Sequence, residues 1–226
     1  MITMIKHFLS EKNPLAIMRR NKMRKNLENN SPTLLCPNCL GGILFHDLGI
    51  KFNSPMVNLM MTQKDFVKFV LNLQDFLNGS FEFFEHETEK CPCAWLQSKS
   101  GEQIVVHFTH YHSREEALEK WYSRSKRIDY SNMFVCLMER DSLTKDEILA
   151  LGNLNLRGLL VFTSQKYEDI PYTLYIKEYE KDGEVGNLLK KNYLNDCRLY
   201  EKYFDFVKWF NEADGTNYNI SKFKLK

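Results

Sequence analysis

A cysteine, two glycines and a His-Asp pair lie close together in residues 38–59, NCLGGILFHDLGIKFNSPMVNL. Cys39 follows a short apolar run, and His46 comes seven residues later. Two helical turns would place both side chains on one face. A thiol beside an imidazole is the usual minimum for nucleophilic catalysis by cysteine. The segment therefore predicts a Cys/His site, and the alternative is a buried cysteine with a hydrogen-bonded helix histidine.

Further polar residues follow the predicted strands, at the edge where open α/β sheets bind ligands. Asn38 and Cys39 follow residues 33–36, and a helix N-terminus at this point is expected to lower the thiol pKa. His110 follows the predicted strand 103–109, and we expect it to approach Cys39 from that strand end. The other residues expected at this edge are Tyr111, His112, Glu139, Arg140, Asp141, Thr163 and Ser164.

Three basic residues form a stripe in a predicted helix. Lys120, Arg124 and Arg127 are spaced by four and three residues, which places them on one helical face. Such a stripe is suited to the phosphate or carboxylate groups of a ligand. The alternative is a solvated face in which these cations pair with Glu116 and Glu119.

Four of the six cysteines raise metal and redox hypotheses. Cys36 and Cys39 have the C-x-x-C spacing of many zinc sites, whereas Cys91 and Cys93 have the tighter C-x-C spacing. A zinc-stabilised binding module would require all four thiols to converge. A thioredoxin-type dithiol at Cys36 and Cys39 is a further alternative. The sequence assigns no metal ligand and no cofactor.

Charge is unevenly distributed along the chain. Residues 1–30 hold seven Lys or Arg and two Glu, although the net charge of the whole protein is only +2. The cluster RRNKMRK (residues 19–25) predicts either contact with anionic lipid or the solvated face of a basic N-terminal helix. The remaining residues have a negative net charge, which argues against a nucleic-acid partner.

The chain has the composition of a globular protein, with 226 residues of which 43% are hydrophobic. No apolar run reaches the roughly 18 residues that a membrane span requires. The first residues, MITMIKHFLSEK, lack the features of a secretory signal. We therefore expect a cytoplasmic protein with a basic helical extension at 1–32 and a single α/β domain at 33–226.

Strand and helix patterns alternate in that domain. Capping boxes at Thr62, Ser113 and Thr144 begin three predicted helices. The run 103–109 is β-branched and apolar, as expected for a central strand covered on both faces. The alternation predicts a three-layer α/β/α sandwich with a mostly parallel or mixed central sheet. Other predicted elements are strands at 33–36, 57–61, 81–84, 133–138, 159–163 and 172–179, and helices at 41–48 and 198–210.

Three separated blocks together resemble the DUF1919 family, bacterial proteins of unknown function that are often labelled exopolysaccharide or capsular polysaccharide biosynthesis proteins. The blocks are residues 38–59, 108–132 (FTHYHSREEALEKWYSRSKRIDYSN) and 137–141 (LMERD). The resemblance implies an α/β/α domain and a role in surface-polysaccharide assembly. It implies catalytic positions at Cys39, His46, Asp47 and His110. It implies substrate-binding positions at Asn38, Gly41, Gly42, Ser54, Tyr111, Arg124, Arg127, Asn132, Arg140, Asp141 and Thr163.

These residues favour a cytoplasmic group transferase of the acyl or glycosyl type, and a faint similarity to capsule acyltransferases, which also place Asn-Cys after an early strand, implies acyl transfer. In acyl transfer, Cys39 would be the nucleophile or a substrate contact, and His46 or His110 the base. Backbone N–H groups of Gly41 and Gly42 would stabilise an oxyanion. The expected partner is a nucleotide-sugar, acyl-coenzyme A or a polysaccharide precursor, held by three cations, Arg124, Arg127 and Arg140. The alternatives are a non-catalytic pathway component that binds a sugar nucleotide or a partner enzyme, and the zinc-stabilised module.

Overall fold

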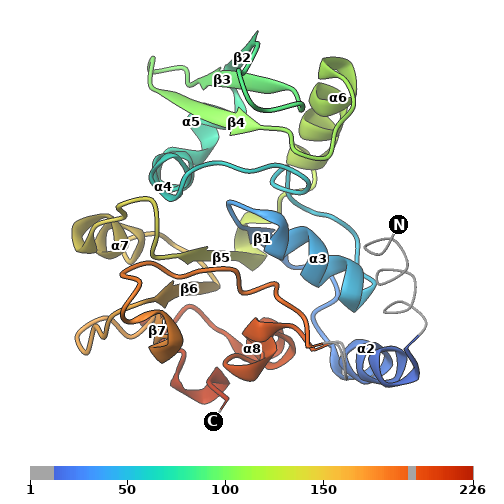
Figure 1. The fold of residues 1–226 in the computed structure, drawn as a ribbon, viewed down its shortest axis with the longest axis vertical. Helices are drawn as coiled ribbons and strands as arrows, with labels where there is room; N and C mark the ends of the chain where they lie inside the picture. Colours follow the sequence, from blue (N-terminus) through green and yellow to red (C-terminus); the bar gives the residue numbers. More distant parts are fainter. Residues whose placement is uncertain (1–12, 193–196, 226) are drawn as a thin grey trace.

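A four-stranded parallel sheet forms the centre of the protein (Figure 1). The computed structural model describes residues 13–192 and 197–225. The strand order is β1 (Thr33–Leu35), β5 (Met133–Met138), β6 (Gly158–Thr163) and β7 (Thr173–Tyr175). Neighbouring strands pair in parallel throughout. β5 and β6 are buried along their whole length, which explains their uninterrupted apolar sequences.

Each face of this sheet has its own hydrophobic core. In β5, Phe134 and Cys136 point to one face, and Val135 and Leu137 point to the other. Helices α3 (Cys39–Leu48) and α8 (Phe206–Glu212) cover the first face, and α4 (Gln63–Leu71) and α7 (Lys145–Leu151) cover the second. The predicted α/β fold class is confirmed.

A second sheet of three antiparallel strands extends the core on the α4 side (Figure 1). Its order is β2 (Ser80–Phe84), β3 (Cys93–Gln97) and β4 (Gln103–His107). Helices α5 (Leu73–Leu77) and α6 (Arg114–Ser125) belong to the same part of the chain. All of these elements lie between β1 and β5 in sequence, so this unit is inserted between two adjacent strands of the parallel sheet.

The strand predicted at the centre of the parallel sheet is instead β4, at the edge of the antiparallel sheet. Ile104 and Val106 are buried while their neighbours are not, so only one face of this strand is fully covered. The β-branched residues therefore reflect cross-strand packing and not burial on both faces. The strand predicted at 57–61 is also wrong, because this segment is a turn with one bridge between Met60 and His107.

Two predicted helices are each divided in the structure. The helix that Thr62 caps ends at Leu71, and α5 follows after Asn72. The helix predicted at 198–210 is a 3₁₀ turn at Leu199–Lys202 followed by α8, which Asp205 caps by accepting from the Lys208 N–H. Shorter 3₁₀ turns occur at Tyr130–Asn132, Lys177–Tyr179 and Ser221–Phe223.

Helix α2 (Pro14–Asn26) precedes β1 and packs against α3. Asn13 caps it by accepting from the Leu15 N–H, and Pro14 occupies its first turn. Within residues 13–192 and 197–225, no helix is long and apolar enough to cross a membrane.

Replacing Gly158 by alanine should lower the free energy of unfolding by about 1–3 kcal/mol. A Cβ at this buried position would lie 2.6 Å from Phe134 Cδ1 and 2.8 Å from Trp209, so the aromatic core would have to move. Urea denaturation measures the change. Asn153→Ala, at an exposed position in the preceding loop, is the control and should leave stability nearly unchanged. Equal stability of both variants would contradict this account of the packing.

Candidate functional site

A cysteine–histidine pair lies at the N-terminus of α3. Cys39 Sγ is 3.5 Å from His110 Nε2. The Asn38 side chain accepts from the Leu40 N–H at 2.9 Å, and this cap makes Cys39 the first residue of the helix. His110 comes from the loop after β4, where its backbone N–H donates to the Asn58 carbonyl at 3.4 Å. The structure therefore brings together two of the predicted catalytic residues, from distant parts of the chain.

The Cys39 thiol is half-buried, and this burial raises its pKa above the ordinary value. Repulsion from Cys36 raises the pKa further, whereas hydrogen bonds from its own backbone N–H and from Thr109 oppose the shift. The backbone N–H at the helix N-terminus acts in the expected direction, but burial outweighs it and the net shift of this pKa is upward. A protonated thiol needs a base to become a nucleophile, and His110 is in contact with it.

A second thiol lies beneath the same helix end. Burial acts to raise the pKa of Cys36, but hydrogen bonds from Cys136 and from the backbone N–H groups of Asn38 and Gly41 outweigh it and lower the pKa. A Cβ on Gly41 would lie 3.2 Å from the Cβ of Cys36, so the glycine permits this close contact. The Gly41 N–H, expected to stabilise an oxyanion, therefore points to a buried sulfur. Gly42 packs against Val57.

Three residues around this edge have the left-handed backbone conformation. They are Asn58 (φ 68°), Asp141 (φ 56°) and Ser142 (φ 58°). The Asn58 carbonyl accepts from Thr109 Oγ1 at 3.3 Å as well as from the His110 N–H. Non-glycine residues in this conformation cost free energy and are concentrated at functional sites. Asn58 links this strain directly to the loop that presents His110.

The ends of β5 and β6 are joined by a buried carboxylate, Glu139. It accepts from the Ser164 N–H at 2.7 Å, the Ser164 hydroxyl at 2.8 Å and Gln165 Nε2 at 2.7 Å, and also from the Tyr167 hydroxyl. Burial acts to raise the pKa of Glu139, but these four donors outweigh it and lower the pKa. Both carboxylate oxygens are engaged, so Glu139 has a structural role between two loops.

The remaining predicted residues of these strand ends differ in exposure. Thr163 is fully buried and its hydroxyl donates to the Gln165 carbonyl at 2.8 Å. Asp141 accepts from the Gln63 N–H at 3.1 Å and so stabilises the start of α4. Arg140 Nε lies 3.7 Å from Asp141 Oδ1, and its side chain is 41% exposed. Arg140 is therefore an accessible cation at the carboxyl edge of the sheet.

The three residues of the predicted basic stripe bind protein groups: Lys120 of α6 pairs with Glu119 at 2.9 Å, and Arg127 lies just beyond the end of that helix. Arg124 Nη1 donates to the Val57 carbonyl at 3.0 Å and to the Tyr111 hydroxyl at 2.6 Å. The Tyr111 hydroxyl itself donates to the same carbonyl at 2.9 Å. Arg127 donates to the Phe52 carbonyl at 3.2 Å. These contacts fasten the loop 52–57 in place.

Two further predicted substrate contacts have local partners instead. Ser54, in that same loop, is buried and accepts from the Met56 N–H at 3.1 Å. Asn132 lies at the start of β5, on the opposite edge of the sheet from Cys39, where it bonds to Asn29 at 2.9 Å and to Arg157 at 3.1 Å. The structure therefore does not bring Asn132 to Cys39.

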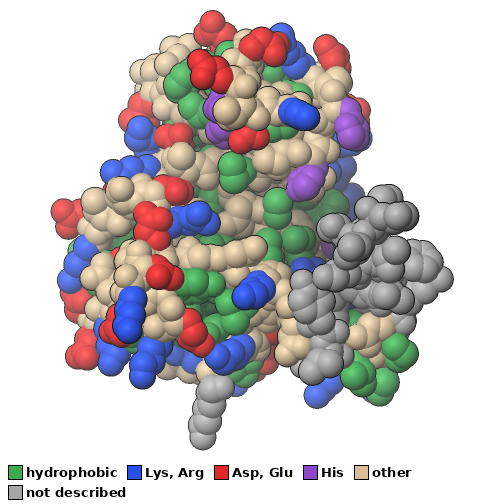
Figure 2. Space-filling model, viewed as in Figure 1, with side chains coloured by type: hydrophobic (Ala, Val, Ile, Leu, Met, Phe, Trp, Pro, Cys, Tyr) green, Lys and Arg blue, Asp and Glu red, His purple; other side chains and the backbone are tan. Residues whose placement is uncertain are grey.

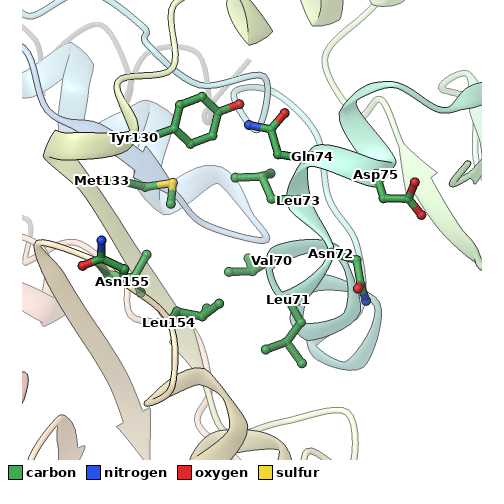
Figure 3. A pocket seen from close by; sticks show the side chains of 11 residues that line it. Val70, Leu71, Asn72, Leu73, Gln74, Asp75, Tyr130, Met133, Leu154 and Asn155 are labelled. Atoms are coloured by element: carbon green, nitrogen blue, oxygen red, sulfur yellow. The ribbon is translucent and has the colours of Figure 1, made fainter. Parts of the chain in front are cut away.

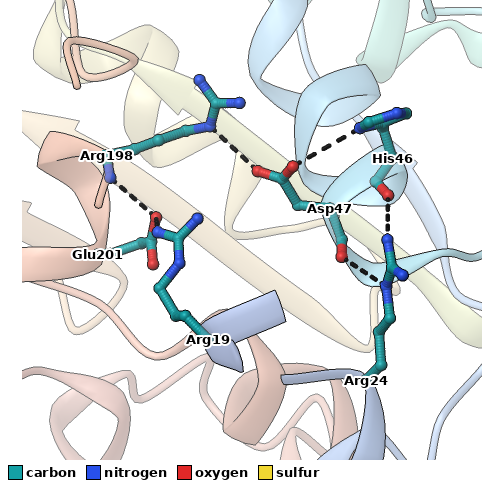
Figure 4. A network of polar contacts seen from close by, with 6 residues as sticks. All are labelled: Arg19, Arg24, His46, Asp47, Arg198 and Glu201. Carbon is teal, nitrogen blue, oxygen red and sulfur yellow. Dashed lines mark hydrogen bonds and ion pairs between the residues drawn. The ribbon is translucent and has the colours of Figure 1, made fainter. Parts of the chain in front are cut away.

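His46 and Asp47 lie at the C-terminal end of α3 (Figure 4). Seven residues of helix correspond to about 10 Å, so His46 is remote from Cys39. The His46 side chain is 72% exposed, and its Nδ1 lies 3.6 Å from Asp47 Oδ1. The Asp47 side chain is only 3% exposed and accepts from Arg198 Nε at 3.1 Å. The structure does not bring either residue to the thiol, and His110 is the imidazole partner of Cys39.

Helix α2 joins this polar network from the outside (Figure 4). Arg24 donates to the Asp47 carbonyl at 3.0 Å and to the His46 carbonyl at 3.3 Å, which are the end groups of α3. Arg19 pairs with Glu201, whose carboxylate also accepts from the Arg198 N–H at 2.9 Å. Two of the basic residues of the N-terminal segment are therefore structural.

The four cysteines of the zinc hypothesis do not converge. Cys36 and Cys39 lie at the start of α3, whereas Cys93 is in β3, with its thiol 3.4 Å from His107 Nδ1. Across the described ranges, no three His, Cys, Asp or Glu side chains are grouped as metal ligands, and none of the six cysteines is in a disulfide. The dithiol hypothesis is also disfavoured, because Cys36 pairs with Cys136 and Cys39 pairs with His110.

The sequence profile of the DUF1919 family, a domain of unknown function, matches residues 11–211. The chain belongs to the DUF1919 family. A relative from Haemophilus influenzae, described as an uncharacterized protein, is 34% identical over 191 residues, which are 84% of this chain and 89% of the relative. The resemblance inferred from three sequence blocks is confirmed, and its association with polysaccharide assembly stays a prediction.

The DUF1919 fold also contains an apolar hollow of about 340 Å³ far from the thiol (Figure 3). Leu73 of α5, Met133 of β5 and Leu154 line it. Met133 begins β5, so the hollow lies at the amino edge of the sheet, opposite the Cys39 edge. On the face drawn in Figure 2, histidine side chains gather in the upper part of the molecule, around the antiparallel sheet and its junction with the parallel one.

Asp47→Asn should lower the free energy of unfolding of this DUF1919 protein by roughly 3 kcal/mol. The Arg198 guanidinium is only 12% exposed and would lose its charged partner. His46→Gln is the matched control. The His46 side chain is next to Asp47 in sequence but is exposed, so this substitution should change stability by less than about 0.5 kcal/mol. Chemical denaturation of both variants is the measurement, and similar losses in the two would refute the structural role of Asp47.

Alkylation of Cys39 by iodoacetamide should be slow at neutral pH and accelerate as the pH rises, because its raised pKa keeps the thiol protonated. Mass spectrometry of the peptide containing Cys39 follows the rate. His110→Phe should slow the reaction near neutral pH by removing the base 3.5 Å from the sulfur. His112→Phe, at an exposed neighbouring position, should not. A rate already at its maximum below pH of about 7 would contradict the raised pKa.

Proposed function

We propose that this protein is an acyl-type group transferase of cell-surface polysaccharide assembly, acting in the cytoplasm with Cys39 as nucleophile and His110 as general base. The observation that supports the reaction is the 3.5 Å contact between the two side chains at the carboxyl edge of the sheet. The polysaccharide setting rests on the labels that DUF1919 proteins often have.

The chemistry follows in two steps. His110 takes the proton of the Cys39 thiol, and the sulfur attacks the acyl carbonyl of a thioester donor such as acyl-coenzyme A. The donor thiol leaves with a proton, and an acyl-cysteine thioester remains. His110 then takes the proton of an acceptor hydroxyl, whose oxygen attacks this thioester. A new ester forms, and the Cys39 thiol is regenerated.

Two further groups at this edge suit the same reaction. Within the part of the chain that the structure describes, the Asn38 amide donates to a weak acceptor, the Met138 thioether at 3.8 Å, so its N–H group is available to a substrate carbonyl oxygen. Arg140 is the exposed cation at the end of β5 and suits a phosphorylated donor. Acyl transfer is favoured over glycosyl transfer, because both carboxylates at this edge are engaged: Glu139 accepts from four donors, and Asp141 accepts from the Gln63 N–H and lies beside Arg140.

The raised pKa of Cys39 favours one alternative, a non-catalytic component that binds a sugar nucleotide or a partner enzyme at the same edge. In that case the thiol is a contact and not a nucleophile. The transferase and the binding component can be distinguished by removing the Cys39 sulfur.

Cys39→Ala should abolish restoration of polysaccharide production when it replaces the native protein in a deletion strain, because no thioester can form. Cys91→Ala removes a half-exposed thiol near β3 and should restore production fully. His110→Gln should fail, and His112→Gln should succeed. Thermal melting of the purified variants separates loss of chemistry from loss of fold. Full restoration by Cys39→Ala would exclude covalent catalysis and leave the binding role.

A ligand comparison identifies the donor. Acyl-coenzyme A should raise the melting temperature of the native protein more than a nucleotide-sugar does, since ligand binding to the folded state stabilises it. Arg140→Gln should reduce this shift. Stabilisation by a nucleotide-sugar and not by acyl-coenzyme A would contradict acyl transfer and favour the sugar-nucleotide-binding component.

A further inference from the structure

The inner face of α2 packs against the body of the protein. Ala16 is completely buried, Arg19 pairs with Glu201, and Arg24 binds carbonyls at the end of α3. The Arg19–Glu201 pair is mostly shielded from solvent. These contacts hold the helix in one rotational setting, so the opposite face of α2 is presented to the outside in a defined direction.

That outer face is a stripe of four residues spaced by three, four and three, namely Leu15, Met18, Lys22 and Lys25. This spacing places them on one helical face. Leu15 is 58% exposed and Met18 is 67% exposed, and both lysines are exposed as well. Figure 2 shows hydrophobic side chains on the surface at the position of α2, with a basic side chain beside them. We call these four residues the α2 stripe.

The charge of α2 indicates what the stripe binds. Residues 14–26 contain five Arg or Lys and no Asp or Glu. A second copy of the same helix would be repelled by this charge, whereas an anionic surface would be attracted. On this exposed face the apolar side chains can enter the headgroup region while the neighbouring lysines, with their long side chains, reach anionic lipid groups. We infer that the α2 stripe docks the protein on an anionic lipid bilayer, with Leu15 and Met18 entering the headgroup region and Lys22 and Lys25 contacting lipid phosphates or carboxylates.

This docking is independent of the proposed reaction at Cys39. The docking surface is on α2, whereas Cys39 begins α3. The inference concerns how the protein is oriented on a membrane and not a chemical step. Because α2 is fixed to the end of α3 through Arg24, binding of the stripe would orient α3, which has Cys39 at its other end, with respect to the bilayer.

Co-sedimentation of the full-length protein with lipid vesicles tests the inference. The protein should bind vesicles of phosphatidylcholine with phosphatidylserine, and bind vesicles of phosphatidylcholine alone much less. Lys22→Glu/Lys25→Glu should weaken binding to the anionic vesicles by about tenfold or more. Leu15→Ser/Met18→Ser should weaken it as well, and high salt should weaken it further by screening the lysines.

Lys90→Glu/Lys99→Glu is the matched control, with the same change in net charge on exposed lysines near the antiparallel sheet, away from α2. It should bind anionic vesicles like the native protein. Unchanged binding by the stripe variants would overturn the inference, as would equal loss in the control or equal binding to both kinds of vesicle. A native dimer that the stripe variants dissociate in analytical ultracentrifugation, without vesicle binding, would assign the stripe to a protein contact instead.

Discussion

The placement of α3 on β1 is the constraint on which the rest of the structure depends. At its first turn, the Asn38 cap and the close approach of Gly41 to Cys36 bring the helix backbone against the end of the strand. At its last turn, the buried Asp47 is held by Arg198. Polar contacts therefore hold both ends of α3, and breaking them would lower the stability of the folded protein. This packing of α3 against β1 places the Cys39 thiol at the edge of the sheet.

The same packing of α3 explains why the Cys39 thiol stays protonated. The amides that would stabilise a thiolate at the helix N-terminus are engaged beneath it, with Leu40 on the Asn38 cap and Gly41 on Cys36. Burial and the neighbouring sulfur of Cys36 raise the pKa of Cys39 and outweigh the hydrogen bonds from its own backbone N–H and from Thr109. Its reactivity must then come from His110, which the strained Asn58 turn positions. Helix position alone does not activate a cysteine when another group takes the amides.

The sequence predicts local structure and strand ends well, but it does not show which charged residues are buried. Capping residues Thr62, Ser113 and Thr144 all begin helices, and the apolar runs of β5 and β6 are the buried strands. The Cys39–His110 contact follows from reading strand ends. The inserted antiparallel sheet was missed, because an apolar β-branched run has the same composition in an edge strand and in a central one. Thr109 and Asn58 were not assigned to the site, and the burial of Glu139 was not foreseen, since backbone strain and long-range hydrogen bonds leave no local pattern.

The basic residues show most clearly that one sequence signal has several physical outcomes. Arg124 is buried on a tyrosine hydroxyl and a carbonyl, Arg19 and Arg24 clamp α2 to the body, and only Lys22 and Lys25 continue the apolar face of that helix into solvent. Arginine dominates the inward set because its planar donors bind two acceptors at once, whereas lysine is a flexible point charge suited to a fluid anionic surface. Side-chain chemistry therefore explains why Arg19 and Arg24 bind acceptors on the body of the protein, whereas Lys22 and Lys25 are presented to solvent.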